Sequence, residues 1–153
     1  IALGIGMKVI ACDNYLDEAI IKLNFYNDNS VSFKIKTISM NKVLKQADFI
    51  TLHVPAQKKY VIDKKEFASM KDGSVLINAA RGGVINEVAL VSALDSGKLS
   101  FAALDTYENE PNPEIKILMH PNISLTPHIG AATNEAQERI GEELAVQINN
   151  LLK

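Results

Sequence analysis

Short apolar runs alternate with amphipathic segments along most of this chain, and this alternation constrains the fold more than any other feature. The runs have the length of strands and cover residues 48–53, 74–78, 100–105 and 123–126. Apolar residues at helical spacing predict helices over residues 39–47, 63–70, 86–96 and 133–152. Strands that alternate with helices form parallel sheets, and apolar strands of this kind are covered on both faces. We therefore predict an α/β fold built on a doubly wound parallel sheet.

The residues before position 39 follow this pattern less closely. The first six residues, with glycines at 4 and 6, predict the last turn of a helix and its glycine stop. A short buried strand is expected over residues 8–12, and a helix over residues 15–23. Residues 24–37 are polar and irregular, and their weak alternation at Val31, Phe33 and Ile35 indicates a loop or a short edge strand.

Composition narrows the class of protein. The 153 residues suffice for one domain with its own core, and 47% hydrophobic with 22% charged residues is typical of globular proteins. A net charge of −2 argues against a nucleic-acid or anionic-membrane surface. No apolar run approaches the roughly 20 residues that span a bilayer. The single cysteine, Cys12, excludes an internal disulfide and fits the cytoplasm, and its apolar neighbours predict that it is buried.

Asp13 ends the first predicted strand. In a dinucleotide-binding sheet, an acid at the end of the second strand accepts hydrogen bonds from the adenosine ribose and favours NAD over NADP. The alternative is an aspartate that caps the turn it begins. The run from Gly4 to Gly6 is not the phosphate-binding fingerprint, because position 9 is valine and the run precedes a strand. We therefore expect a domain truncated at its amino end, with the fingerprint lying before residue 1.

Arg81, Glu110 and His128 each follow one of the apolar runs. Groups just past the carboxyl ends of parallel strands converge on one crevice, where ligands bind. A guanidinium grips a carboxylate through two parallel hydrogen bonds and polarises a neighbouring carbonyl. The small residues around Arg81, Ala80 and Gly82 among them, leave room for a ligand, whereas the alternative is a surface salt bridge.

His128 has the surroundings of a proton-transfer group. Pro127 restricts the backbone just before His128, and the small residues Gly130 and Ala131 leave space for a flat ring. Imidazole titrates near neutral pH, so it can take a proton from a hydroxyl and return it to a carbonyl oxygen. A nearby carboxylate would stabilise the imidazolium, and spacing alone leaves both Glu108 and Glu110 open for this role. A lone histidine is more often structural, and His53 and His120, which lack such surroundings, are interpreted as structural or peripheral.

At these residues the chain resembles the D-isomer-specific 2-hydroxyacid dehydrogenases, nearest to their D-3-phosphoglycerate dehydrogenase branch. The resemblance covers nearly the whole chain and is carried by residues 48–55, 76–87, 103–105, 110–111 and 126–132. It implies a Rossmann-like NAD-binding domain over residues 1–153, with the substrate or lid domain outside this chain. Residues 24–38 match no motif of the family.

The resemblance also implies an activity and a set of site residues. The activity is NAD-dependent oxidation of a D-2-hydroxy acid, with 3-phosphoglycerate and serine biosynthesis the leading case. The rivals are sister enzymes for glyoxylate, hydroxypyruvate or D-lactate, and a non-catalytic NAD-sensing corepressor. The implied catalytic residues are Arg81, His128 and Glu110, since the family's glutamate directly precedes a proline. Implied cofactor contacts are Asp13, Val54, Pro55, Ala79, Ala80, Arg81, Asp105 (for the nicotinamide carboxamide), His128, Gly130 and Ala131. A homodimer is expected, and no metal site.

Overall fold

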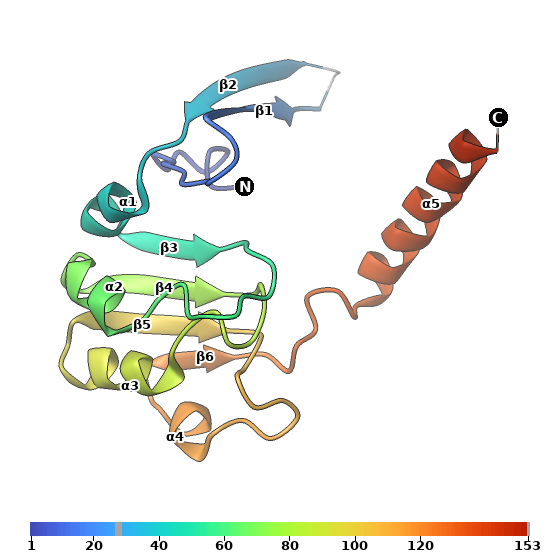
Figure 1. Cartoon of the computed structure of the whole chain (residues 1–153). Coiled ribbons are helices and arrows are strands. Elements are labelled where there is room, and N and C mark those ends of the chain that lie inside the picture. Colours follow the sequence, from blue (N-terminus) through green and yellow to red (C-terminus); the bar gives the residue numbers. More distant parts are fainter. Residues whose placement is uncertain (27–28, 153) are drawn as a thin grey trace.

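A parallel four-stranded sheet forms the centre of the computed structural model, which describes residues 1–26 and 29–152 (Figure 1). Its strands lie side by side in chain order: β3 (Phe49–Leu52), β4 (Ser74–Asn78), β5 (Leu99–Leu104) and β6 (Ile123–Leu125). Helices α2 (Lys64–Ser69), α3 (Glu87–Asp95) and α4 (Ile115–Leu118) connect them, and all three strand pairs are parallel. The predicted α/β, Rossmann-like class is confirmed.

Local signals in the sequence set most of the boundaries of these helices. The Asp63 side chain accepts from the backbone of Lys64 and, with Glu66, forms a capping box at α2. Asn86 Oδ1 accepts from the Ala89 backbone N–H at 3.0 Å and caps α3, and Gly97 follows this helix with φ of 73°. Helix α1 (Met40–Gln46) begins after Ser39 as expected, although the Ser39 side chain makes no capping hydrogen bond.

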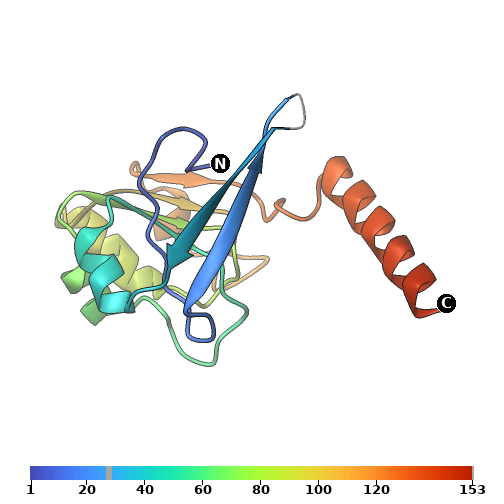
Figure 2. The same cartoon turned by 90° about the horizontal axis from the view of Figure 1, so that it is seen from above.

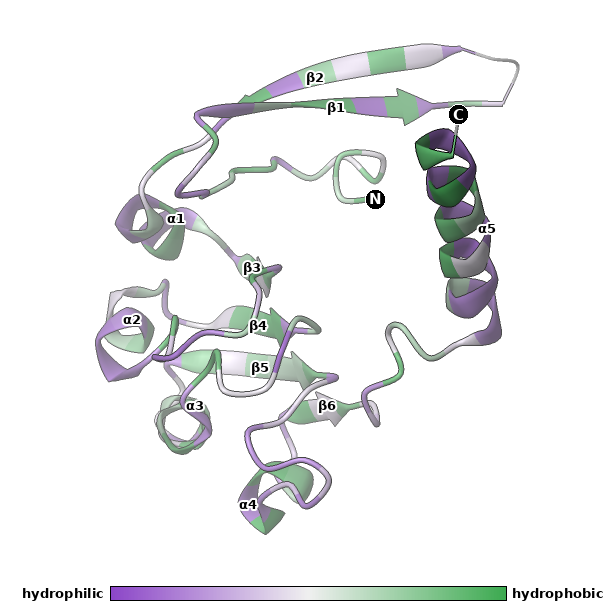
Figure 3. Ribbon diagram, turned by 45° about the vertical axis from the view of Figure 1, so that its right-hand side comes forward, coloured by the Kyte–Doolittle hydropathy of each residue, from purple (hydrophilic) through white to green (hydrophobic). Residues whose placement is uncertain are grey.

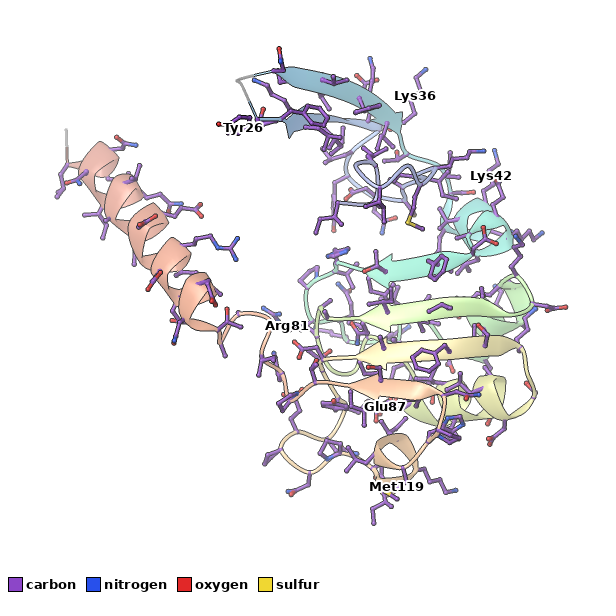
Figure 4. All side chains as sticks on the ribbon, turned by 180° about the vertical axis from the view of Figure 1, so that it is seen from behind. Tyr26, Lys36, Lys42, Arg81, Glu87 and Met119 are labelled. Atoms are coloured by element: carbon purple, nitrogen blue, oxygen red, sulfur yellow. The ribbon has the colours of Figure 1, made fainter. Side chains whose placement is uncertain are left out.

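The core lies on one face of the sheet. Leu76 in β4, Ala102 in β5 and Leu90 in α3 are all 0% exposed and belong to one hydrophobic cluster. On the opposite face Phe49 and Phe101 are 56% and 38% exposed, and Figure 4 shows this face without a covering helix. For the described residues, the prediction that both faces are covered is therefore wrong. Burial of apolar strand faces is favourable, but the strands alone do not determine on which face the next helix packs.

Helix α5 (Asn134–Leu151) is present as predicted, yet it extends away from the sheet (Figures 1 and 2). Thr133 caps it, with Oγ1 accepting from the Ala136 backbone N–H at 3.2 Å. Its apolar stripe is visible in Figure 3 and is open to solvent, with Ile140 51% and Leu144 54% exposed. Among the described residues, no helix is both long and apolar enough to cross a membrane.

The amino-terminal region contains a separate antiparallel hairpin of β1 (Glu18–Asn24) and β2 (Ser30–Lys36). The helix predicted over residues 15–23 is wrong, because Ile21 and Leu23 pair across the hairpin with Phe33 and Val31. Cross-strand partners on one face stabilise strands, and this contact between distant residues overrides a local helical pattern. The alternation at Val31, Phe33 and Ile35 did indicate a strand, and this strand is confirmed.

The first residues agree with the sequence only in part. Met7 and Gly6 donate backbone hydrogen bonds to Ala2 and Leu3, and Gly6 has φ of 83°, so the helical turn with a glycine stop is confirmed. The strand predicted over residues 8–12 is reduced to a single parallel bridge between Ala11 and Thr37. Because this segment is not built into the sheet, Cys12 is exposed, and the prediction that it is buried is wrong.

Candidate active site

Three loops meet at the carboxyl ends of neighbouring strands. Arg81 follows β4, Glu110 lies in the loop after β5, and His128 follows β6. Since these strands are parallel and adjacent, their carboxyl ends share one edge of the sheet, and Figure 4 shows Arg81 at this edge.

Glu110 and His128 form the central pair of the site. The His128 Nδ1 atom lies 2.8 Å from Glu110 Oε2, and the two side chains remain 42% and 35% exposed. Hydrogen bonds from His128 and from the Tyr107 backbone N–H lower the pKa of the Glu110 carboxyl below its ordinary value. An ionised carboxylate only accepts hydrogen bonds, so Nδ1 carries the proton and Nε2 is the nitrogen left to exchange one with a substrate. Of the two glutamates left open by the spacing, Glu110 is the one bonded to His128.

Tyr107 holds Glu110 in place. Its backbone N–H donates to Glu110 Oε1 at 2.9 Å, and its hydroxyl donates to the Thr126 carbonyl at 2.6 Å. The residue is only 6% exposed, and burial raises the pKa of its hydroxyl, which therefore stays a donor. Tyr107 thus ties the Glu110 loop to the chain just before His128.

Asp105 organises the loop that carries His128. Its Oδ1 accepts from Thr126 Oγ1 at 2.6 Å and from the Ile129 backbone at 2.9 Å, while Oδ2 accepts from the Gly130 backbone at 2.9 Å. Burial raises the pKa of Asp105, but these hydrogen bonds together with the His128 ring outweigh it, and the net direction is down. Within this frame His128 has φ of 55°, a left-handed conformation that costs energy in a non-glycine residue.

The Arg81 loop is folded by Asn78 and packed against Tyr107. Asn78 is 2% exposed; its amide donates to the Arg81 carbonyl at 3.0 Å and accepts from the Ala80 backbone at 3.1 Å. A Cβ added to Gly82 would lie 1.8 Å from the Tyr107 carbonyl oxygen, so the two loops touch through backbone atoms. No ion pair of Arg81 is found in residues 1–26 and 29–152, so the salt-bridge alternative is not seen there.

The residues implied for the nicotinamide end of NAD gather partly at this edge. A hollow of about 140 Å³ lies there, lined by Ile77, Asn78, Ala79, Ala103, Leu104, Asp105, Ser124, Leu125 and Thr126. Its small alanines and the flanking polar groups of Asp105 and Thr126 fit a flat amide-bearing ring. Ala80 does not line this hollow and is 8% exposed, while Gly130 and Ala131 are exposed. A larger hollow of about 790 Å³, around Tyr60 and Lys64, contains none of the predicted site residues.

The residues implied to contact the adenosine end of NAD do not line either hollow. Val54 and Pro55 follow β3, partly buried and exposed respectively. Asp13 Oδ1 accepts from the backbone of Tyr15 at 2.7 Å and of Leu16 at 3.0 Å, which is the turn-capping alternative. The described chain contains no G-x-G-x-x-G run to receive a pyrophosphate.

Sequence reasoning missed the residues that hold the site together, chiefly Asn78 and Tyr107. Asn78 carried a signal, since a buried strand that ends in asparagine often uses the amide to fold the next turn. Tyr107 was not singled out, because the contact of its hydroxyl with the Thr126 carbonyl joins residues 19 positions apart. His120 is structural as predicted, with Nδ1 accepting from the Asn122 backbone at 3.1 Å and Nε2 3.3 Å from Asp95.

Comparison with known proteins gives consistent results. A sequence model described as "D-isomer specific 2-hydroxyacid dehydrogenase, NAD binding domain" matches residues 1–130. The chloroplastic D-3-phosphoglycerate dehydrogenase 2 of Arabidopsis thaliana is 40% identical over 156 residues, covering 99% of this chain and 23% of that protein. The hydroxypyruvate reductase of Thermotoga maritima is 40% identical over 152 residues, covering 96% of this chain and 46% of that protein.

Solved structures show the same likeness. A D-lactate dehydrogenase from Treponema pallidum aligns with a TM-score of 0.69 and 35% identity, over 88% of this chain and 42% of that one. A glyoxylate reductase from Paecilomyes thermophila aligns with a TM-score of 0.66 and 43% identity, over 70% of this chain and 33% of that one. This chain therefore spans less than half the length of each of these relatives.

Proposed function

This chain belongs to the D-isomer specific 2-hydroxyacid dehydrogenases, through their NAD binding domain, and from this premise we propose that the protein oxidises a D-2-hydroxy acid to the 2-keto acid. The observation that carries the proposal is the hydrogen bond of 2.8 Å between His128 and the ionised Glu110. NAD is the cofactor of this family domain, and when bound it accepts the hydride lost by the substrate carbon.

Each of the three residues has one task in this mechanism. Arg81 holds the substrate carboxylate, because its guanidinium has no ion-pair partner in the described residues and its fork matches a carboxylate. His128 removes the hydroxyl proton through Nε2 as the carbonyl double bond forms. Glu110 keeps the ring oriented and stabilises the imidazolium that results. In the reverse direction His128 returns the proton to the carbonyl oxygen.

We propose 3-phosphoglycerate as the substrate, with the product 3-phosphohydroxypyruvate placing the protein in serine biosynthesis. Curated relatives named D-3-phosphoglycerate dehydrogenase from a plant, an archaeon and an animal support this choice, each at 36–40% identity. Reduction of hydroxypyruvate or glyoxylate is the second candidate, favoured by the Thermotoga maritima relative and by the glyoxylate reductase fold. Oxidation of D-lactate is the third.

The test is NADH formation by the intact protein offered 3-phosphoglycerate, D-glycerate, D-lactate and D-2-hydroxyglutarate in parallel. In the same assay His128→Ala should lower turnover by about 10²- to 10⁴-fold, the range of general acid–base catalysis, while the Kd for NAD changes little. His120→Ala, a histidine outside the site, serves as the matched control. Activity on none of the four acids despite NAD binding would contradict the proposal and favour an NAD-sensing binding protein.

We further propose a cytoplasmic homodimer, on the family resemblance and the single cysteine. Light scattering on the intact protein tests the oligomeric state, and a monomeric mass would reject the dimer.

A further inference from the structure

Glu87 is a buried acid that the mechanism above does not use. It stands at the first turn of α3, is 6% exposed and appears with Arg81 in Figure 4. Its Oε2 atom has no hydrogen-bond partner among the described residues. A buried carboxyl oxygen without a partner costs free energy, so the position of Glu87 calls for a compensating contact.

That contact is a reciprocal pair of hydrogen bonds with Glu108. Glu87 Oε1 accepts from the Glu108 backbone N–H at 2.8 Å, and Glu108 Oε1 accepts from the Glu87 backbone N–H at 2.7 Å. The second bond satisfies one of the free N–H groups at the amino end of α3, where negative charge is also favoured. The Tyr60 hydroxyl donates to Glu108 Oε2 at 3.1 Å, so both oxygens of Glu108 are engaged.

This pair joins a rigid helix to the loop that carries Glu110. Helix α3 is anchored in the core by Ala89 and Leu90, which are 4% and 0% exposed. Glu108 directly follows Tyr107, the residue whose backbone N–H donates to Glu110. A shift of the Glu108 backbone therefore moves the donor that orients Glu110.

We propose that Glu87 is a positioning residue for the Glu110–His128 pair, acting through its reciprocal hydrogen bonds with Glu108. The inference rests on the proposed function and extends it to a residue that touches neither substrate nor cofactor. This role explains why an acid is buried at this place. The Oε1 atom holds the Glu108 loop, and this contact offsets the free-energy penalty of the Oε2 atom, which has no hydrogen-bond partner among the described residues.

The surroundings of Glu87 act on the pKa of its carboxyl in both directions. Burial is the largest cause and raises the pKa, the hydrogen bond from the Glu108 backbone lowers it, and the carboxylates of Glu108, Glu114 and Glu110 raise it further, so the net direction is up. The Oε1 atom accepts from the Glu108 backbone whichever form the carboxyl takes. Glutamine offers the same acceptor without the charge, so Glu87→Gln is the conservative variant and Glu87→Ala the disruptive one. Val88→Ala, at the exposed neighbouring position, is the matched control.

The experiment compares these variants in the intact protein with two independent readouts. The first is kcat, KM and the pH profile with the best D-2-hydroxy acid. The second is a carbon-13 titration of the Glu110 carboxyl, which needs no turnover. Glu87→Ala should lower kcat by roughly 10- to 100-fold, as a misplaced catalytic group does, and move the pKa of Glu110 up toward its ordinary value. Glu87→Gln should recover kcat to within about threefold of the parent, since the acceptor is kept.

A purely structural role predicts a different pattern. In that case Glu87→Ala lowers the melting temperature while kcat and the pKa of Glu110 stay as in the parent, and the proposal is overturned. Should Glu87→Ala fail to fold, Glu108→Ala and Glu108→Gln test the other half of the pair with the same readouts. An absence of turnover in the parent protein would reject the proposed function alone, because the titration of Glu110 still tests the positioning role.

Discussion

The parallel sheet and the amino-terminal hairpin both have strands with alternating side chains, but only the sheet has a core. In β4, Ser74, Leu76 and Asn78 are buried. In β1 and β2 no described residue is buried, although seven residue pairs are in register. Regular pairing is therefore common to both regions, while burial distinguishes them. Alternation in a sequence therefore predicts that a segment is a strand, but it does not predict which elements pack against that strand.

The candidate site is built on the better-packed region. Arg81, Glu110 and His128 stand on loops that follow buried or partly buried strand ends; Asn78 folds the Arg81 loop, while Asp105 and Tyr107 fasten the chain after β5 to the loop of His128. The geometry of a site on loops is held more precisely when the strands and helices beneath the loops rarely unfold locally. The hairpin offers no such support, and none of the predicted site residues lies in it.

The largest difference in stability between the two regions should appear when a core side chain is truncated. Leu90→Ala removes a fully buried side chain between α3 and the sheet. It should lower the free energy of unfolding by about 2–5 kcal/mol, since a cavity remains where the side chain was. Urea unfolding of the intact protein measures this, with the exposed Val88→Ala as control; equal effects of the two variants would contradict the assigned core.

Breaking the contact between two site loops should mainly affect activity. Gly82→Ala places a Cβ 1.8 Å from the Tyr107 carbonyl, so this carbonyl or the Arg81 loop must move. Turnover should fall by roughly 100-fold, the effect of displacing catalytic groups by about 1 Å. The control is Gly141→Ala in α5, where an added Cβ meets nothing within 4 Å. It should leave turnover unchanged and stabilise the helix by up to about 1 kcal/mol.

The site also predicts a dependence of stability on pH. The pKa of Glu110 is lowered in the folded state by His128 and Tyr107. The stability that Glu110 contributes is therefore fully present above the ordinary carboxyl pKa and is lost as the pH falls through the lowered value. The difference in urea midpoint between the parent and Glu110→Gln should shrink in that acidic range. A difference that stays constant with pH would show that the hydrogen bonds do not favour the ionised form.

The smallest effect is expected in the hairpin. Phe33 pairs with Ile21 across the strands but remains 38% exposed. Phe33→Ala should therefore cost only about 0.2–1 kcal/mol, the range of a cross-strand pair, and should leave NADH formation unchanged. A loss comparable to that of Leu90→Ala would mean that the hairpin face is covered in the intact protein.

The sequence predicted the regular part of the fold well, for identifiable reasons. Strands β3 to β6 were predicted because each is a short apolar run, and α2, α3 and α5 because apolar residues recur in them at helical spacing; the structure adds the caps Asp63, Asn86 and Thr133 at their starts. The helix expected over residues 15–23 was wrong because Ala19 and Leu23 fit two patterns: with Ile20 they form a helical face, and with Ile21 they alternate along one face of a strand. The buried Cys12 was wrong because an apolar run does not guarantee a place in the sheet.

From the sequence alone it was possible to predict strands β3 to β6 and helices α1, α2, α3 and α5, but not α4, together with the strand ends that carry Arg81, Glu110 and His128, and the family. These follow from local spacing and from residue chemistry. Spacing left Glu108 and Glu110 open as the partner of His128; the family resemblance favoured Glu110, and the tertiary structure shows its contact with His128. The pairing of Glu108 with Glu87 came from the tertiary structure alone. The same holds for the contact of Gly82 with Tyr107 and for the uncovered face of the sheet. Each of these depends on atoms far apart in the chain, and their meeting is set by how the whole core packs.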